Sequence, residues 1–248
     1  MANSSIESPV ASPAPPLKWA PAWVIACVAA WPAPGIAEAL LALGALVMLG
    51  YLAWQRFTGD GRRLLSVPAW ALTSTLFLAY WLPQLFSAVD ADDPGRAWGR
   101  VAAGLRHLPF MWLVAIAVAS DARRRVTFTG LGVVVALWVA DALAQALAGS
   151  SPLFWSMDQV KWLISGHGLC SAGEAAQADR LSGVFGPCNL KFGQVLASLT
   201  PFLLFAAAAR WGRWGWLLAA VPTGVVIVLA GSRASWITYA LVMLFSGW

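Results

Sequence analysis

The sequence has few charged residues. They make up only 11% of the 248 residues, whereas hydrophobic residues make up 60%. Soluble domains carry about a quarter charged residues, so this balance excludes an ordinary soluble domain. The net charge of +5 is divided among short clusters that lie between apolar segments. Because there is no continuous basic face, nucleic acid is not an expected partner, and the composition predicts a polytopic membrane protein in a lipid bilayer.

Cysteine is also scarce, with three residues, and neither a P-loop nor a glycine-rich dinucleotide-binding motif occurs. No cofactor is therefore expected. Cys27 lies in the first apolar segment, where a thiol packs like a small hydrophobic side chain. Cys170 and Cys188 share one loop and allow a single pairing. We expect them to form a disulfide if that loop faces an oxidising compartment.

Metal ligands and catalytic bases are few. The run Asp90-Ala-Asp-Asp93 has carboxylates that suit magnesium or manganese, but Pro94 follows it, and acidic residues before Pro-Gly are common in turns. We therefore expect no metal. His167 is either a catalytic base or a loop residue without a chemical role. His107, next to Arg106 near the outer end of the fourth apolar segment, either lines a polar cavity or lies at the membrane interface.

Apolar runs predict an all-α bundle of about eight membrane segments over residues 17–248. Residues 1–16, rich in Ser, Pro and Ala, predict a disordered tail. Most runs approach the ~20 residues that a helix needs to cross a bilayer. The last run reaches the end of the sequence, so the chain is expected to stop inside its final helix. The runs are Leu17–Trp31, Ile36–Trp54, Val67–Val89, Trp98–Ala119, Val126–Leu147, Leu190–Ala209, Trp214–Ala230 and Ala234–Trp248.

Basic and acidic connections alternate along the chain. The positive-inside rule assigns the short basic connections, and with them the N-terminus, to the cytoplasm. The acidic connections then face outward. The basic connections hold Arg56, Arg62, Arg63, Arg123–Arg125, Arg210 and Arg213, and the acidic ones hold Asp90, Asp92, Asp93, Asp158, Glu174 and Asp179.

One outer loop, residues 148–189, is too long to be a simple connector between helices. Within it, residues 153–164 predict a helix with Phe154, Met157, Lys161 and Ile164 close to one face. We expect this helix to lie along the outer membrane surface rather than to cross the bilayer.

Three cations are expected at the outer ends of helices. Arg180 and Lys191 flank a Gly/Pro/Cys/Asn bend that leads into an apolar segment, and Arg233 lies between the last two segments. Cations at a membrane entrance are costly unless an anion meets them. They either bind a phosphorylated headgroup, for which the Arg donor fork is suited, or snorkel to lipid phosphates as anchors.

Asp141 and Gln145 lie four residues apart in the fifth segment and therefore share a helix face. A carboxylate within an apolar segment needs a partner, and an Arg on the outer side is the expected one. Such a pair either belongs to the site or only locks helices together, because buried ion pairs are not reliably functional.

Three motifs in this order resemble the O-antigen ligase and polymerase superfamily of bacterial membrane glycosyltransferases. They are Asp141-x-x-x-Gln145 with Gly149, then Asp179-Arg-Leu-Ser-Gly-Val-Phe-Gly186 leading into Asn189-Leu-Lys-Phe-Gly193, and Ser232-Arg-Ala-Ser-Trp236. The resemblance extends over about residues 36–248. Pro187-Cys188-Asn189 is similar to the Asn-Pro-Asn bend of many members, and Lys191-Phe-Gly193 favours the ligase branch.

The resemblance implies transfer of a glycan from undecaprenyl pyrophosphate to lipid A–core at the periplasmic face of the inner membrane, without a metal. It implies that Arg180 and Arg233, with Lys191, hold the pyrophosphate. The family takes its catalytic histidine from a second periplasmic loop, which would lie beyond Trp248, so these residues alone are expected to be inactive. The expected supporting residues are Asp141, Gln145, Asn189 and Arg106.

Three alternatives to a ligase stay open from the sequence. The first is an O-antigen polymerase, which joins repeat units to one another. The second is a small-anion transporter, in which the same arginines would line a path, although transporters place such charges near the midplane between repeated halves. The third is a structural or interaction subunit.

Overall fold

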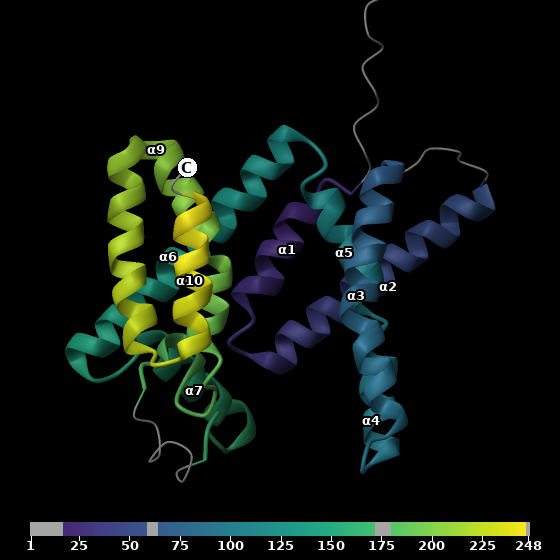
Figure 1. Cartoon of the computed structure of the whole chain (residues 1–248). Helices are drawn as coiled ribbons and strands as arrows, with labels where there is room; N and C mark the ends of the chain where they lie inside the picture. The colour runs from purple at the N-terminus through teal and green to yellow at the C-terminus, as the bar shows by residue number, and fades with distance from the viewer. Residues whose placement is uncertain (1–16, 59–63, 172–179, 247–248) are drawn as a thin grey trace, which may run out of the picture.

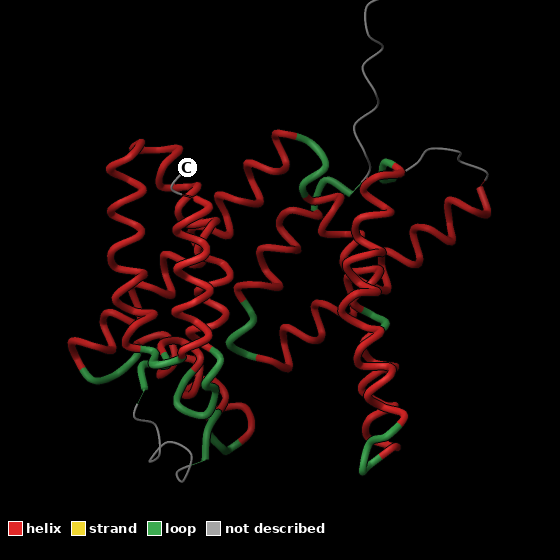
Figure 2. The backbone as a smooth tube through the Cα atoms, viewed as in Figure 1, coloured by secondary structure: helices red, strands yellow, loops and turns green. Residues whose placement is uncertain are grey.

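The structure, a computed structural model, describes residues 17–58, 64–171 and 180–246. Every regular element in these ranges is helical, as Figure 2 shows. The predicted all-α class is therefore confirmed. The predicted tail at residues 1–16, as well as Arg62, Arg63, Glu174, Asp179 and Trp248, lies outside the described residues. The elements are α1 Ala20–Ala29, α2 Pro34–Thr58, α3 Val67–Val89, α4 Pro94–Gly104, α5 His107–Ala117, α6 Asp121–Ala148, α7 Pro152–Ser165, the 3₁₀ turn η1 Gly183–Phe185, α9 Phe192–Leu229 and α10 Arg233–Ser246.

The helices form two groups, which we call the N-terminal sub-bundle (α1–α5) and the C-terminal sub-bundle (α6–α10). Figure 1 shows them side by side, with α1 between α5 and α6. In the C-terminal sub-bundle, α9 packs on α6 and α10 packs on α9. Its core surrounds Trp138, Phe185 and Phe192. A second core, around Met48 and Leu113, joins α1, α2 and α5.

Local sequence signals define the ends of two helices. Ser120 caps α6, because its hydroxyl accepts a hydrogen bond from the backbone N–H of Arg123, and Gly149 ends that helix at φ 76°. Ser151 caps α7 in the same way, and Gly166 ends it at φ 73°. Glycine adopts this left-handed conformation without steric cost, so the short connection between α6 and α7 is encoded locally.

Four helices are long and apolar enough to cross a membrane: α2, α3, α6 and α9. These helices indicate a membrane protein. The eight predicted membrane segments do not correspond to eight separate long helices. α1 has only 10 residues and α10 has 14, so both fall short of a full crossing.

The 38 residues of α9 contain the sixth and seventh predicted segments. Gly212, with φ 61° and ψ −146°, is not helical and divides α9 into residues 192–211 and 213–229. Figure 1 shows the chain reversing direction at this point. A Cβ atom at Gly215 would collide with the carbonyl group of Ala207, so the two halves touch immediately after the reversal.

The fourth predicted segment, Trp98–Ala119, is not one helix. It divides into α4 and α5, which are separated at Leu105 and Arg106. Both helices pack against α3, so they lie one after the other along it. The prediction overlooked Pro109, which has no N–H to bond to the carbonyl oxygen of Leu105 four residues earlier, so the helix breaks there.

The connections alternate between two ends of the molecule. In Figure 1 the α5–α6 connection and the kink of α9 lie at the upper end, which we call the basic end. The α3–α4, α6–α7 and α9–α10 connections lie at the lower end, which we call the loop end. The arginines predicted to share one side of a membrane, Arg123–Arg125, Arg210 and Arg213, flank the two connections of the basic end.

Candidate functional site

Two sequence regions meet at the loop end around Arg180. The backbone N–H of Leu181 donates to the carbonyl oxygen of Leu229, 3.4 Å away, at the end of α9. The side chain of Arg180 lies against Gly231, where Cγ and Cδ would be 3.4 Å from an added Cβ. Gly231 has φ 68° and stands two residues before Arg233, the first residue of α10. The structure therefore brings Arg180 to the turn that carries Arg233.

Lys191 reaches the same region through close helix packing. It stands at the N-cap position of α9 without a capping hydrogen bond from its side chain, and Gly193 in the first turn of this helix lies against Ser235 in the first turn of α10. An added Cβ at Gly193 would be 2.8 Å from Ser235 Oγ. Only glycine allows this approach of the two helix starts, so Gly193 holds the segment of Lys191 close to that of Arg233.

The three cations are exposed, and within the described ranges no Asp or Glu forms an ion pair with them. The predicted convergence of their segments at one end of the bundle is therefore found.

Asp141 does not pair with an arginine, contrary to the sequence prediction. It is 5% exposed and accepts two hydrogen bonds from the start of α7. The hydroxyl group of Ser151 donates to Oδ2 at 2.7 Å, and the backbone N–H of Leu153 donates to Oδ1 at 2.8 Å. A carboxylate at a helix N-terminus is stabilised by the unsatisfied N–H groups and the helix dipole. Asp141 therefore fastens α7 to α6.

Gln145, one turn further along α6, fastens the loop that follows Arg180. Its Oε1 accepts a hydrogen bond from the backbone N–H of Gly183 at 2.7 Å. Its Nε2 lies 3.5 Å from the hydroxyl oxygen of Ser182, which is buried. The two residues that share a face of α6 thus bind two different parts of the outer loop. The sequence predicted the shared face but not these partners.

The segment Gly183-Val-Phe-Gly186 is buried in the C-terminal sub-bundle. Phe185 packs edge-on against Trp138, with ring centroids 5.3 Å apart. Gly183 and Gly186 have φ of 51° and 73°, and the rings of Phe192 and Phe154 occupy the positions of their missing Cβ atoms. Both glycines are required by conformation and by space. The loop therefore enters the core at Gly183, only three residues after Arg180.

Two further links hold the outer loop. Cys170 and Cys188 form a disulfide, with Cα atoms 5.5 Å apart, that joins the chain after α7 to the bend before α9. Asn189 Oδ1 accepts from the backbone N–H of Lys191 at 3.2 Å, so Asn189 orders the entry into α9. Its supporting role is local to the bend.

Only part of the face that the sequence predicted for α7 packs against the core. Phe154 and Gly186 are in contact, and Met157 packs on the core, as expected for an inward face. Ile164 is 82% exposed, although it shares the helix face of Met157. Exposed apolar residues are distributed around α7, namely Leu153, Trp155, Val160, Trp162, Leu163 and Ile164.

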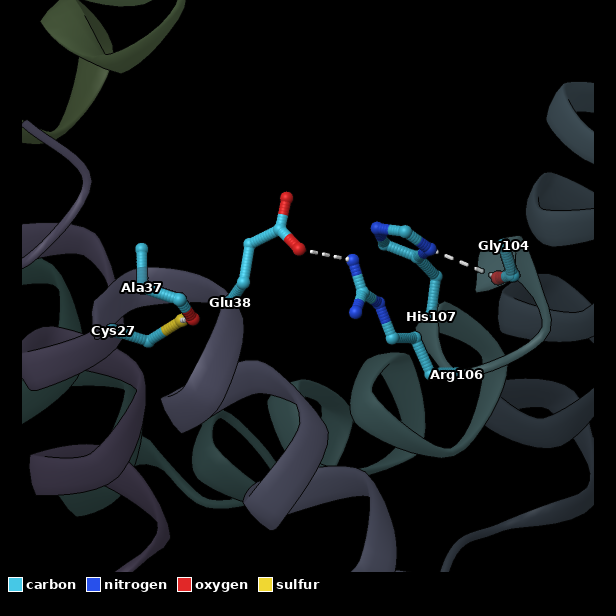
Figure 3. A network of polar contacts seen from close by, with 6 residues as sticks. All are labelled: Cys27, Ala37, Glu38, Gly104, Arg106 and His107. Atoms are coloured by element: carbon cyan, nitrogen blue, oxygen red, sulfur yellow. Dashed lines mark hydrogen bonds and ion pairs between the residues drawn. The ribbon is translucent and has the colours of Figure 1, made fainter. Parts of the chain in front are cut away.

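Arg106 is not part of the cation cluster, which corrects its expected supporting role. It forms an ion pair with Glu38 of α2, with 2.7 Å between Nη2 and Oε2 (Figure 3). Next to it, His107 Nδ1 lies 2.9 Å from the carbonyl oxygen of Gly104. This network belongs to the N-terminal sub-bundle, at the break between α4 and α5. The prediction placed both residues near an outer helix end because it assumed an unbroken helix.

The remaining candidates have structural partners. Asp93 Oδ1 accepts from the backbone N–H of Arg96, so it caps α4, as the turn interpretation implied. In the described part of the chain, no group of three metal-ligating side chains occurs. His167 is exposed, and its Nδ1 lies 3.3 Å from the carbonyl oxygen of Gly168; no carboxylate among the described residues orients the ring.

Two residues of the site were missed by the sequence interpretation. Ser182 contacts Gln145, and Ser235 is fully buried with a hydroxyl oxygen that has no hydrogen-bond partner among the described residues. Both were visible as the serines of the motifs around Arg180 and Arg233. Serine is common at such positions, so only burial distinguishes them.

Comparison with known protein families, curated proteins and solved structures gives no match. The interpretation of the site therefore depends on its geometry and on the sequence motifs. The geometry brings together the segments of three exposed cations, Arg180, Lys191 and Arg233, next to a loop that is fastened to the core.

Proposed function

We propose that the three cations of the loop end bind the pyrophosphate of a lipid-linked glycan, and that the chain is an O-antigen ligase-like glycosyltransferase. The observation that carries the proposal is the side chain of Arg180 lying along Gly231, which unites two motifs 53 residues apart. An Arg presents a planar fork of donors that fits two phosphate oxygens. Cations near helix ends, without an ion-pair partner among the described residues, suit the depth of a lipid headgroup.

The chemical contribution of the cations is electrostatic. When an acceptor hydroxyl of lipid A–core attacks the anomeric carbon, negative charge develops on the departing undecaprenyl pyrophosphate. Arg180 and Arg233 stabilise that charge if they are held in place before the reaction. Asp141 and Gln145 act through the loop, because they fasten its two ends to α6. The acceptor also needs a base, for which His167 lacks an orienting partner among the described residues.

The proposal includes an orientation. The basic end faces the cytoplasm together with the N-terminus, and the loop end faces the periplasm, in agreement with the positive-inside rule. The eight apolar segments then make eight passes through the inner membrane. In this count α4 and α5 form one broken pass, the halves of α9 form two, and α1 and α10 are passes whose helices are shorter than the hydrocarbon core.

An O-antigen polymerase would use the same donor and the same cations, so it is the closest alternative. A small-anion transporter is less well supported, because Arg180 and Arg233 lie at helix ends, whereas transport sites lie near the membrane midplane.

The test uses variants of the complete gene product in a strain that lacks O-antigen ligase. We expect Arg233→Lys and Arg180→Ala to insert into the membrane normally and to lose transfer by a factor on the order of 10²–10³, as when an oxyanion donor is removed. Arg124→Ala, at the basic end, is the matched control and should keep transfer. Lipopolysaccharide gels measure the glycan ladder. A ladder of parental intensity with Arg233→Lys would show that this charge is only an anchor.

A further inference from the structure

A short sequence repeat lies at the point where α9 reverses direction. Residues 210–215 read Arg-Trp-Gly-Arg-Trp-Gly, so the same three residues occur twice in succession. The first glycine, Gly212, is the non-helical residue of the reversal, and the second, Gly215, lies against the carbonyl group of Ala207. The hairpin itself therefore uses both glycines, and the repeat leaves two Arg-Trp pairs at its tip, one on each half of α9 (Figure 1).

The four side chains of this hairpin tip are exposed. Trp211 and Trp214 are each 63% exposed, and a Cβ atom added to Gly212 would meet no atom of a more distant described residue within 4 Å. Arg210 and Arg213 are exposed as well, and the guanidinium carbon of Arg213 lies 5.5 Å from the centroid of the Trp214 ring. The described part of the chain therefore leaves two large rings and two guanidinium groups uncovered side by side.

The charge of the hairpin tip is positive and is not balanced nearby. The sequence contains no Asp or Glu from Arg180 to its last residue, so neither half of α9 carries a carboxylate. At the start of α6, which shares the basic end, Asp121 forms an ion pair with Arg124. Within the described ranges, Arg210 and Arg213 form no ion pair with an acidic side chain. An anion at the tip would thus meet two arginines and no carboxylate of α9.

The lengths of the two halves of α9 suit a tip at the depth of lipid headgroups. α9 is a candidate membrane span, and residues 192–211 extend over about 30 Å at the helical rise, which matches the hydrocarbon core of a bilayer. The tip follows directly, so it adjoins the headgroup layer. Trp favours this layer because its ring is amphipathic, and Arg presents a planar fork of donors that fits phosphate oxygens.

We propose that the hairpin tip is a binding site for the phosphate of an anionic phospholipid in the leaflet of the basic end. Arg210 and Arg213, one from each half of α9, donate to the phosphate oxygens, and Trp211 and Trp214 lie in the interface beside them. A zwitterionic lipid has the same phosphate, but its ammonium group offsets the charge, so the site prefers the anionic headgroup. This site lies at the opposite end of the bundle from Arg180 and does not depend on the function proposed there.

The test measures whether anionic lipid is enriched next to the hairpin tip. Cys27→Ala removes the free thiol, and the disulfide protects Cys170 and Cys188 from labelling. A fluorophore on Ala209→Cys, an exposed position next to Arg210, is quenched by brominated lipids in nanodiscs. The quenching by brominated phosphatidylglycerol, compared with that by brominated phosphatidylcholine, gives the preference for the anionic lipid.

The matched control is a second pair of exposed arginines, on α4. Arg96 and Arg100 stand one turn apart and carry the same charge, but three exposed aspartates among residues 90–93 precede them. A fluorophore on Ala102→Cys, which is also exposed, reports on this pair. We expect almost no preference for phosphatidylglycerol at this label, because the neighbouring carboxylates repel an anionic headgroup.

At the hairpin tip we expect a preference for phosphatidylglycerol of at least about tenfold, since each arginine near an anionic lipid surface contributes about fivefold in affinity. Arg210→Gln and Arg213→Gln should each lower the preference about fivefold, and the double variant should abolish it. Arg96→Gln with Arg100→Gln removes the same charge and should leave the preference at the tip unchanged. Elution as a single species from size exclusion checks that each variant is folded.

Inorganic phosphate, added at constant ionic strength, separates a lipid site from a site for free phosphate. It should leave the preference unchanged, because the tip meets its phosphate in the headgroup layer. Equal preferences at the two labels, a preference that survives in the double variant of Arg210 and Arg213, or its loss on addition of inorganic phosphate would overturn the proposal.

Discussion

The two sub-bundles differ in how far they bury a carboxylate and in how many hydrogen bonds it accepts. In the most apolar stretches of α6 and α9, 44% and 39% of the residues are buried in the protein, compared with 17% and 11% in α2 and α3. The C-terminal sub-bundle buries Asp141 and satisfies it with two donors. The N-terminal sub-bundle leaves Glu38 exposed with one. Dense packing thus occurs where a loop must be held, and it makes every buried polar contact there more costly to lose.

The largest expected loss of stability comes from removing the disulfide of the C-terminal sub-bundle, and the free cysteine of the N-terminal sub-bundle gives the comparison. Replacing Cys170 and Cys188 by Ser removes a link that closes a loop of 18 residues, which costs about 3 kcal/mol in chain entropy. Cys27→Ser, in the N-terminal sub-bundle, is the control. The measurement is the thermal unfolding midpoint in detergent with and without reductant. Reductant should lower the midpoint of the parent and of Cys27→Ser, and it should leave the double variant unchanged. A midpoint of the parent that reductant does not alter would contradict the expected role of this link.

Two aspartates that cap helices give the second comparison. Asp141→Ala leaves the Ser151 hydroxyl and the Leu153 N–H without their buried acceptor, so we expect a loss of about 2–3 kcal/mol. Asp93→Ala removes an exposed cap from α4 and should cost about 1 kcal/mol.

Chemical denaturation followed by circular dichroism compares the two aspartate variants. Proteolysis at Lys161 of α7 should become faster with Asp141→Ala alone, because this change releases the start of α7 from α6. Equal losses of stability and unchanged cleavage would mean that Asp141 does not hold α7.

The smallest expected effect is that of Glu38→Gln. If water reaches the ion pair, its loss should cost less than about 1 kcal/mol, as for exposed pairs. If the pair instead lay in dry hydrocarbon, the unpaired Arg106 would destabilise the protein by several kcal/mol. The unfolding midpoint in nanodiscs separates these outcomes, with Glu38→Asp as a variant that keeps the charge. A large drop with Glu38→Gln would mean that the N-terminal sub-bundle is as intolerant of lost polar contacts as the C-terminal one.

Much of the fold was predictable because its signals are local. Long apolar runs predict helices, and Ser120 with Gly149 places the ends of α6. Arginine clusters predict which connections share an end of the bundle. The meeting of the three cation-bearing segments was predictable to the same extent, since Lys191 and Arg233 stand at helix starts and Arg180 precedes a bend.

Hydrogen-bond partners that are distant in the sequence were not predictable. Asp141 was expected to meet an arginine, because charge is the most visible complement in a sequence, but a hydroxyl and a backbone N–H satisfy it instead. Backbone donors have no signature in the residue type. The break at Leu105 and Arg106 was missed although the sequence carries a signal for it, since Pro109 removes the N–H that would bond to the carbonyl oxygen of Leu105.

The sequence by itself therefore determined a helical membrane chain, the alternation of its connections and the positions of its cations, because hydropathy, charge and glycine act locally. Only the tertiary structure decided that Arg180 lies along the turn of Arg233, that α6 fastens the outer loop and that Arg106 belongs to a different network. Each of these depends on which helix faces are in contact. That choice is made by packing over the whole bundle, and no short stretch of sequence contains it.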